Sequence, residues 1–569
     1  MHCMSRKPLW LLAAAIAACS SGTEPHLRPC TAAGDSVVLA IPGAYRSIDA
    51  VLDSGCTVFP ANGTPATLEY LVVPQLATGV PGKTGSFRLG GDTILPVPGP
   101  SPGIGEPPSS PALQFHDFLR LGEERRSWGF PPNRDAMAKA APALEGPAVQ
   151  AGPPALNDQR AFMVCARLDC STFTRVIARV RAVQSKVAIY VDTLAPAGGL
   201  DSTQLDSIAK TFDQRLYPID TAAFGRESDI DTNSVVLVLM TNVVNKLVSA
   251  SVCLKTGFVA GFFFGLDLDP QFRNDSRSNK GEVFYSIVAD PTGKLSCKHS
   301  VIDVQRFVPV TFIHEFQHMI SFNQHVLVRS GSSEVLWLNE GFSHYAEELG
   351  GRSYETQPDA PVSTCVIGTT QCRFYGGDLI DAYTYLDSTG KHFLLPTSGI
   401  GTLAERGAAW MFVRYVVDRY SGGTTAAQWN AFTRRLLQTT NTGAQNVAAV
   451  TGVPFETVVS RWALANYVSD LPGFAAPPEL KYDSWSYRAT FASLNAQVDT
   501  VFKKPFPLVA TVSEGRSVLL TGTLRAGSGI YHRATQSPGD PGFTLQFTSA
   551  NGGLFNVALV PRLNVIRIR

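Results

Sequence analysis

Charge and long apolar runs are both scarce in this chain of 569 residues. Only 17% of the residues are charged, and 48 basic against 47 acidic side chains leave a formal net charge of +1. A nucleic-acid-binding face needs an excess of basic residues, so the composition predicts no nucleic-acid partner. Beyond the N-terminus, no stretch reaches the roughly eighteen continuous apolar residues of a membrane-spanning helix. Hydrophobic residues nevertheless make up 44% of the chain, which is enough for packed cores in several domains.

The first eighteen residues have the layout of a secretory signal peptide. Arg6 and Lys7 precede a short apolar run that ends immediately before Cys19. The small residues on both sides of Cys19 resemble a bacterial lipoprotein processing box, in which this cysteine becomes the lipidated first residue. Cleavage without lipidation is the alternative. We therefore expect an extracytoplasmic protein that is anchored to a bacterial membrane only through its N-terminal lipid, or a secreted one if Cys19 is not lipidated.

Eight of the ten cysteines remain after Cys3 and Cys19 are set aside. An even number of cysteines suits disulfide bonds in an oxidising compartment, although the sequence cannot fix their connectivity. A cysteine metal site is less favoured, because no Cys-x-x-Cys pair is present. Pairing each cysteine with its neighbour in the chain gives Cys30 with Cys56, Cys165 with Cys170, Cys253 with Cys297, and Cys365 with Cys372.

His314, Glu315 and His318 form a His-Glu-x-x-His motif inside an apolar segment. The residues from Arg306 to His325 are apolar enough for a buried helix, provided that Pro309 falls near its first turn. Residues i and i+4 share one face of a helix, so both imidazoles can bind one metal ion while the glutamate lies beside it. The motif predicts a zinc hydrolase.

Glu340 is the expected third ligand of that metal. A second helix is predicted from Glu334 to Leu349, and its return against the first helix would bring the Glu340 carboxylate to the two imidazoles. Two histidines, one glutamate and an open fourth position make a catalytic zinc site. His344, one turn beyond Glu340, is the alternative ligand. His325 is instead expected to be a surface histidine near a helix end.

The segment from Trp337 to Glu347, following His-Glu-Phe-Gln-His, resembles the gluzincin branch of zinc peptidases, and most closely the hyicolysin-like bacterial metallopeptidases. The resemblance runs from about residue 160 to about residue 470. It implies one zinc ion held by His314, His318 and Glu340, with Glu315 as the catalytic base. It also implies a thermolysin-like, two-lobed α+β catalytic domain, with the metal in the cleft between a sheet lobe and a helical lobe.

The chain departs from the related aminopeptidases in two ways. It lacks their Gly-x-Met-Glu-Asn motif, which would hold a substrate amino terminus, and Ala404 replaces the tyrosine that steadies their oxyanion. Arg406, Tyr345 or Tyr415 could supply the missing electrophilic group. Glu347 and Glu348 are the acidic candidates for orienting a ligating histidine, with solvated helix faces as the alternative.

Two further segments have candidate binding roles. In the related peptidases a strand beside the cleft pairs with the substrate backbone, and the segment from Gly281 to Tyr285 resembles that strand. Phe284 and Tyr285 would then border the substrate, or else pack within the sheet. Asp229, Asp231 and Asn233 could begin a calcium loop, but the glycine and distant glutamate of an EF-hand are absent, so an acidic turn is favoured.

Patterning divides the chain into five parts. They are a signal peptide (1–18), an N-terminal β-sandwich-like domain (19–92), a Pro/Gly-rich linker with a short helix from His116 to Arg126 (93–159), the peptidase domain (160–475) and a C-terminal β-sandwich-like domain (476–569). Alternating β-rich runs at each end, such as Ser36–Ile41 and Leu563–Arg569, predict one separate sandwich at each end of the chain.

The predicted activity is zinc-dependent hydrolysis of internal peptide bonds in a peptide or protein substrate, with Glu315 accepting a proton from water. A catalytically inactive, lipid-anchored binding or adhesion protein on a zincin scaffold is one alternative. A zinc aminopeptidase is another. The intact motif around Glu315 favours activity, and the absent aminopeptidase motif favours internal cleavage.

Overall fold

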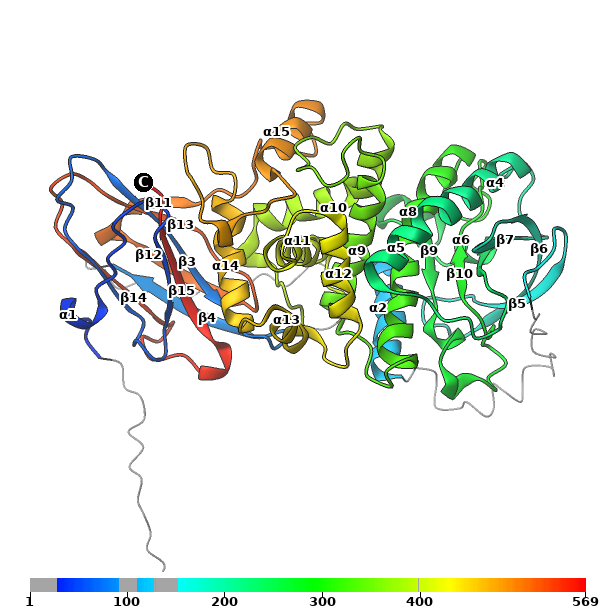
Figure 1. Cartoon of the computed structure of the whole chain (residues 1–569), viewed down its shortest axis with the longest axis horizontal. Helices are drawn as coiled ribbons and strands as arrows, with labels where there is room; N and C mark the ends of the chain where they lie inside the picture. Colours follow the sequence, from blue (N-terminus) through cyan, green and yellow to red (C-terminus); the bar gives the residue numbers. More distant parts are fainter. Residues whose placement is uncertain (1–27, 92–109, 127, 129–151, 398) are drawn as a thin grey trace, which may run out of the picture.

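The computed structural model describes residues 28–91, 110–126, 128, 152–397 and 399–569. The fold is α+β. A β-sandwich lies at one end of the long axis, helices fill the middle, and a six-stranded sheet with its own helices lies at the other end (Figure 1). Within the described ranges, no helix has the length and apolar character needed to cross a membrane. The predicted signal peptide and Cys19 lie outside these ranges.

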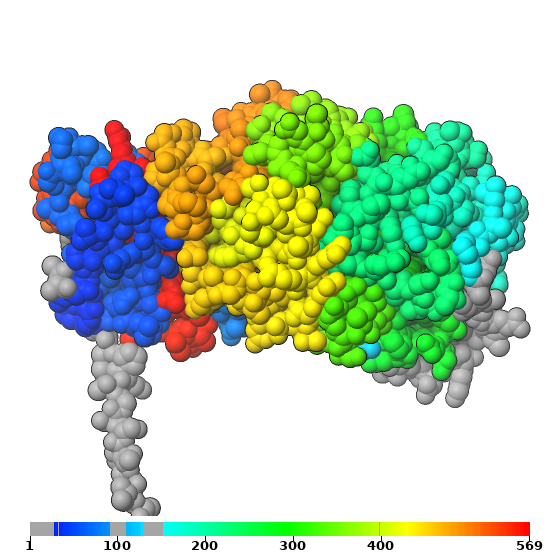
Figure 2. All heavy atoms as spheres, in the orientation of Figure 1, coloured from blue at the N-terminus to red at the C-terminus, as the bar shows by residue number. Residues whose placement is uncertain are grey.

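Strands from both ends of the chain build one sandwich. Its first sheet has the order β1-β15-β3-β13-β11 and its second the order β12-β4-β14-β2. The strands are β1 (Tyr45–Asp49), β2 (Cys56–Phe59), β3 (Leu68–Leu76), β4 (Thr84–Gly90), β11 (Thr511–Glu514), β12 (Leu519–Arg525), β13 (His532–Gln536), β14 (Phe543–Ser549) and β15 (Pro561–Arg567). The last strand, β15, lies antiparallel between β1 and β3. Figure 2 shows blue N-terminal atoms and red C-terminal atoms together at this end of the molecule.

The prediction of two separate sandwiches was therefore wrong. Each terminal segment alternates apolar and polar residues as predicted, but neither closes its sheets alone. Pairing of β14 with both β2 and β4 places Phe59, Phe87 and Phe547 in one shared core. Period-two patterning identifies strands, but it does not say which strands pair across several hundred residues. Residues Ser36–Ile41 form no strand beyond a single bridge at Ser36.

The six-stranded sheet has the order β5-β6-β7-β8-β10-β9. Its strands are β5 (Gln159–Cys165), β6 (Phe173–Val183), β7 (Val187–Asp192), β8 (Val236–Met240), β9 (Gly261–Phe263) and β10 (Val283–Ser286). Strands β7, β8 and β10 run parallel, whereas β9 is antiparallel and forms one edge. All five residues of β8 are buried, as expected for a parallel strand covered on both faces.

Helices cover the six-stranded sheet and fill the middle of the molecule, except α1, which lies beside β2 of the sandwich (Figure 1). They are α1 (Ala32–Asp35), α2 (Pro111–Arg125), α4 (Ser202–Thr211), α5 (Tyr217–Phe224), α6 (Asn242–Asn245), α7 (Ala250–Thr256), α8 (Val301–Phe322), α9 (Leu336–Arg352), α10 (Thr370–Asp387), α11 (Leu403–Tyr420), α12 (Ala426–Leu437), α13 (Gly443–Thr451), α14 (Phe455–Val468) and α15 (Tyr487–Gln497). One apolar core runs from the sheet through these helices and reaches the face of β3.

The helix that carries His-Glu-x-x-His begins five residues before the predicted start at Arg306. Ser300 and Asp303 form a capping box, in which each side chain accepts from the other's backbone N–H, and α8 therefore starts at Val301. Pro309 consequently lies in the helix interior rather than its first turn. Burial of this helix against the sheet outweighs the missing hydrogen bond at the proline.

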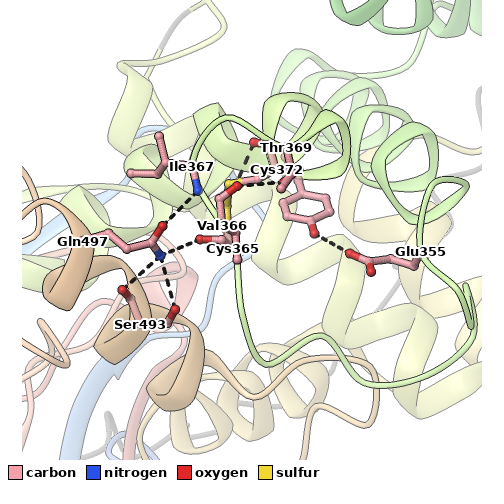
Figure 3. The surroundings of a disulfide bond; sticks show 9 residues. Glu355, Cys365, Val366, Ile367, Thr369, Cys372, Ser493 and Gln497 are labelled. Carbon is pink, nitrogen blue, oxygen red and sulfur yellow. Dashed lines mark hydrogen bonds between the residues drawn. A yellow bond between two sulfur atoms is a disulfide. The ribbon is translucent and has the colours of Figure 1, made fainter.

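The four predicted disulfide bonds are confirmed. They join Cys30 to Cys56, Cys165 to Cys170, Cys253 to Cys297, and Cys365 to Cys372. The last of them ties the loop before α10 to the first turn of α10, and Gln497 of α15 binds the same loop (Figure 3). There the Gln497 amide donates to the Cys365 carbonyl (2.9 Å) and accepts from the Ile367 N–H (2.9 Å). The disulfide and the amide together fix a connection that has no regular secondary structure.

Candidate metal centre

Helices α8 and α9 bring His314, His318 and Glu340 together. The two Nε2 atoms lie 3.3 Å apart, and the Glu340 carboxylate oxygens lie 3.4 Å from His318 Nε2 and 3.8 Å from His314 Nε2. One nitrogen or oxygen atom from each residue lies within 4.8 Å of the others. Atoms that each bind the same zinc ion at about 2.0–2.2 Å must lie within roughly 4.4 Å of one another. Only small movements of these three side chains are therefore needed for all of them to bind one ion.

The protonation states of the group also fit a metal ion. Burial lowers the pKa of His318 to about 3, and the nearby Arg120 guanidinium adds to this shift, so the imidazole is neutral. Burial opposes ionisation of Glu340, but Arg406 and His318 outweigh it and hold the pKa of this carboxyl well below its usual range. Glu340 Oε2 is buried, and no described residue donates a hydrogen bond to it. A neutral imidazole and an unsatisfied carboxylate are the forms in which these side chains bind zinc.

Two glycines allow the helices to approach closely enough for this arrangement. A Cβ atom at Gly341, beside Glu340, would lie 2.8 Å from Val413 Cγ2 and 3.0 Å from the Ala409 carbonyl on α11. A Cβ atom at Gly407, beside Arg406, would lie 2.3 Å from the backbone of α10. The glycine of Asn-Glu-Gly therefore has a packing role, which its place in a motif did not reveal.

Glu347 orients the first histidine. Its Oε1 lies 2.6 Å from His314 Nδ1, which leaves His314 Nε2 directed at the candidate metal position. Glu348, the other acidic candidate, is not at the centre. It is fully buried and accepts from Arg352, Trp410, Arg414 and Trp485 in the helical part.

Glu315 lies on the neighbouring face of α8 and is 1% exposed. Its Oε2 accepts from the Phe263 N–H of the edge strand β9 (2.9 Å) and lies 3.6 Å from Arg120 Nη2. Its Oε1 lies 3.8 Å from His116 Nδ1. Burial raises the pKa of Glu315, and Arg120 opposes that shift. A carboxylate with a raised pKa is suited to accepting and returning a proton near neutral pH.

Arg406 and His344 also face the candidate metal position. Arg406 Nε lies 3.8 Å and His344 Nε2 lies 4.0 Å from Glu340 Oε2, and neither nitrogen has a hydrogen-bond acceptor in the described part of the chain. His344 is held from behind by Asp378, whose Oδ1 lies 2.8 Å from its Nδ1. The two tyrosine candidates are engaged elsewhere, because Tyr345 accepts from Arg414 and Tyr415 donates to the Glu479 carbonyl.

The predicted substrate strand is wrong in its position. Strand β10 pairs with β8 on one side and β9 on the other, so the backbone around Phe284 and Tyr285 has no free edge. Both side chains are buried: the Phe284 ring packs at a tilt against Phe312, and Tyr285 donates to Asp267. Strand β9 forms the edge of the sheet on this side, and all three of its residues are buried.

The prediction that His325 is a surface histidine is also wrong. Its place near the end of the metal helix is as predicted, but the side chain is fully buried and lies 3.9 Å from Glu334. It lies in the π-helical segment Asn323–Leu327 that follows α8.

Several residues near the centre were not predicted. His116 and Arg120 come from α2, which the sequence placed inside a linker as an ordinary charged helix. Asp378 comes from α10, and nothing near it in the sequence connects it with His344. Long-range packing alone brings these residues in, so no local motif could have identified them.

Comparison with known proteins gives one informative match. A curated relative, the neutral metalloprotease ShpI of Staphylococcus hyicus, is 26% identical over 147 residues, which is 26% of this chain and 31% of that protein. The match thus spans less than a third of the relative's own length. No protein-family profile matches the chain.

Proposed function

We propose that this protein is an extracytoplasmic zinc endopeptidase. The observation that carries the proposal is the convergence of His314, His318 and Glu340 from two packed helices, with Glu315 on the adjoining face. The similarity to a neutral metalloprotease supports the same reaction class. The gluzincin assignment, the thermolysin-like division into a sheet lobe and a helical lobe, the signal peptide and lipidation at Cys19 are parts of this proposal. The catalytic unit would comprise residues 160–475.

A zinc ion held by these three side chains would supply a Lewis acid that polarises the scissile carbonyl and makes water easier to deprotonate. Glu315 accepts a proton from the attacking water, whose oxygen forms a bond to the carbonyl carbon. The carbon–nitrogen bond then breaks, and Glu315 returns the proton to the leaving nitrogen. Glu347 keeps the His314 ring in place throughout.

The developing negative charge on the carbonyl oxygen needs donors, because Ala404 replaces the tyrosine of the related aminopeptidases. His344 and Arg406 have unpaired N–H groups near Glu340 Oε2, and Asp378 holds the His344 ring in orientation. We assign electrophilic stabilisation to these two side chains in place of the predicted Arg406, Tyr345 or Tyr415 alone.

The test compares two peptides of one sequence, one with a free amino terminus and one with a blocked amino terminus, each quenched across an internal bond. An endopeptidase cleaves both peptides at the same internal bond, whereas an aminopeptidase cleaves only the free one from its end. Zinc-loaded protein that binds but never cleaves either peptide would instead favour an inactive binding protein.

A further inference from the structure

A second group of carboxylates lies where the parallel strands β8 and β10 begin, at the opposite end from Met240, the last residue of β8. Asp229 and Asp231 lie in the loop before β8, and Glu282 directly precedes β10. Because β8 and β10 are parallel neighbours, their starts meet at one edge of the sheet. One carboxylate oxygen from each of the three residues lies within 4.8 Å of the others.

Two of these carboxylates are buried with an oxygen atom left unsatisfied. Asp231 is 2% exposed and Glu282 is 1% exposed. Glu282 Oε1 accepts from Ser228 and from the Ile230 N–H, and Asp231 Oδ2 accepts from Asn233. Among the residues that the structure describes, Asp231 Oδ1 and Glu282 Oε2 have no hydrogen-bond donor. An unpaired buried carboxylate oxygen is costly, so this position calls for a positive partner.

The described residues supply only part of that charge. Arg160 Nη1 lies 3.5 Å from Asp231 Oδ2 and is the one ion-pair partner within 4 Å among the described residues. Within 4 Å, three carboxylates face one guanidinium, and the charge of Arg226 acts on the exposed Asp229, so negative charge is in excess around the two buried carboxylates. Burial raises the pKa of Glu282 to about 7 and also raises the pKa of Asp231, which shows how poorly the protein alone supports their ionised forms.

We propose that Asp229, Asp231 and Glu282 bind one calcium ion. Calcium takes oxygen ligands at about 2.3–2.6 Å, so ligand atoms on one ion can be up to roughly 5 Å apart, as these are. The group contains no histidine or cysteine, which disfavours zinc. A divalent ion would offset the excess negative charge and join the β8 loop to the start of β10. The acidic turn predicted at Asp229 and Asp231 is therefore assigned a calcium ion, in a site that is not an EF-hand.

The test is calorimetric titration of calcium into the zinc-loaded protein, with the melting temperature measured in parallel. The parent should bind one calcium ion and melt several degrees higher, because the ligand stabilises the folded state. Asp231→Asn/Glu282→Gln should lose both effects, and Asp359→Asn, at an exposed position, should lose neither. If the double variant does not fold, Asp229→Asn, also at an exposed position, should weaken calcium binding by about tenfold or more. A parent that binds no calcium, or that prefers magnesium, would overturn the assignment.

A different observation concerns α2, which lies where a substrate would have to bind. Its Arg120 donates to the Phe263 carbonyl of the edge strand β9 (2.6 Å) and pairs with Glu123. Phe115 and Leu119 are fully buried, and the Phe115 ring packs edge-on against Phe262. Figure 1 shows α2 at the junction of the helical part and the six-stranded sheet.

These contacts occupy groups that peptide hydrolysis requires, namely the edge of the sheet and the catalytic base. An extended substrate commonly adds to a free sheet edge, yet the outward carbonyl of β9 is taken by Arg120. Arg120 and His116 also stand against Glu315, the predicted base. With Glu315 1% exposed and His318 1% exposed, a peptide cannot reach the base while α2 is in place.

We infer that α2 is an internal inhibitor of the catalytic centre, an inference that rests on the proposed function. Binding of α2 over the catalytic centre is then an equilibrium. Only the fraction of molecules with α2 displaced can bind substrate. The intact chain would retain a low rate of hydrolysis, and displacement of the helix would raise it.

The test introduces recognition sequences for a site-specific protease within residues 93–109 and 129–149 and compares rates before and after cutting. The cut protein, separated from its fragment, should cleave the blocked peptide at least about tenfold faster at unchanged zinc content. A synthetic peptide of residues 110–128 should restore inhibition, and the same peptide with Phe115→Ala and Arg120→Ala should bind about tenfold or more weakly by calorimetry.

A milder variant guards against unfolding of the cut protein. Asp117 accepts from the Ile400 N–H (2.5 Å) and, among the described residues, forms no hydrogen bond with Glu315 or the predicted metal ligands, although its charge acts on Glu340 and Arg406. Asp117→Ala should therefore loosen α2 and raise the rate. Asp359→Ala should not. Equal rates with α2 attached and displaced would overturn the inhibitory role alone. No zinc-dependent cleavage in either form would overturn the proposed function and the inference with it.

Discussion

Replacing Glu315 by glutamine is expected to lower the rate of peptide hydrolysis by about 10²–10⁴-fold, the range for loss of a general acid–base group. Glutamine has nearly the same size and can still accept from the Phe263 N–H, so the fold of α8 should be retained. It cannot accept a proton from water. The rates of parent and variant are compared both in the intact chain and with α2 displaced, and the more active of these two forms is used to judge the change. Zinc content is measured on the same samples.

Glu347→Gln is the matched control for this change. It makes the same chemical replacement on a carboxylate at the same centre, but one that orients His314 rather than facing the reacting atoms. It should weaken zinc binding by about 10–100-fold and recover much of its rate in excess zinc. Glu315→Gln should not recover with zinc. Unchanged proteolysis in Glu315→Gln would refute its assignment as the base.

The second large effect is expected on metal binding. His318→Ala removes one of three predicted ligands and should weaken zinc binding by more than about 100-fold, since loss of an outer partner alone costs up to that much. The isolated protein should then contain almost no zinc. Equilibrium dialysis followed by elemental analysis measures this directly.

His325→Ala provides an equivalent change elsewhere on the same stretch of chain. This histidine is also fully buried, but it lies beside Glu334 and not beside Glu340. The variant should lose stability while keeping one zinc ion per chain. If His325→Ala lost zinc and His318→Ala kept it, the ligand set proposed here would be wrong.

Local patterns in the sequence predicted the parts of the centre that lie close together in the chain. The i and i+4 spacing of His314 and His318 has meaning only on a helix, and the apolar density around them predicted that helix correctly. Glu340 followed from the second helix. Neighbouring cysteines also paired as predicted, because short loops bring their ends together at little cost in entropy.

Features that depend on long-range packing could not be read in the same way. The alternating pattern of Leu563–Arg569 predicted a strand, but nothing local stated that β15 would insert between β1 and β3. The same limit applied to α2, whose arginine and histidine resemble those of any charged helix until the fold places them against Glu315. Phe284 and Tyr285 were misplaced because the order of strands β10 and β9 in the sheet was unknown.

The central claim, that zinc held by α8 and α9 supports cleavage of internal peptide bonds, is tested most directly by one rate followed through metal removal and return. A single preparation is assayed on the blocked peptide as isolated, after chelation with 1,10-phenanthroline, and after dialysis with one equivalent of zinc. We predict that cleavage stops on chelation and returns with zinc. Cleavage that continues at the same rate in metal-free protein would contradict the account.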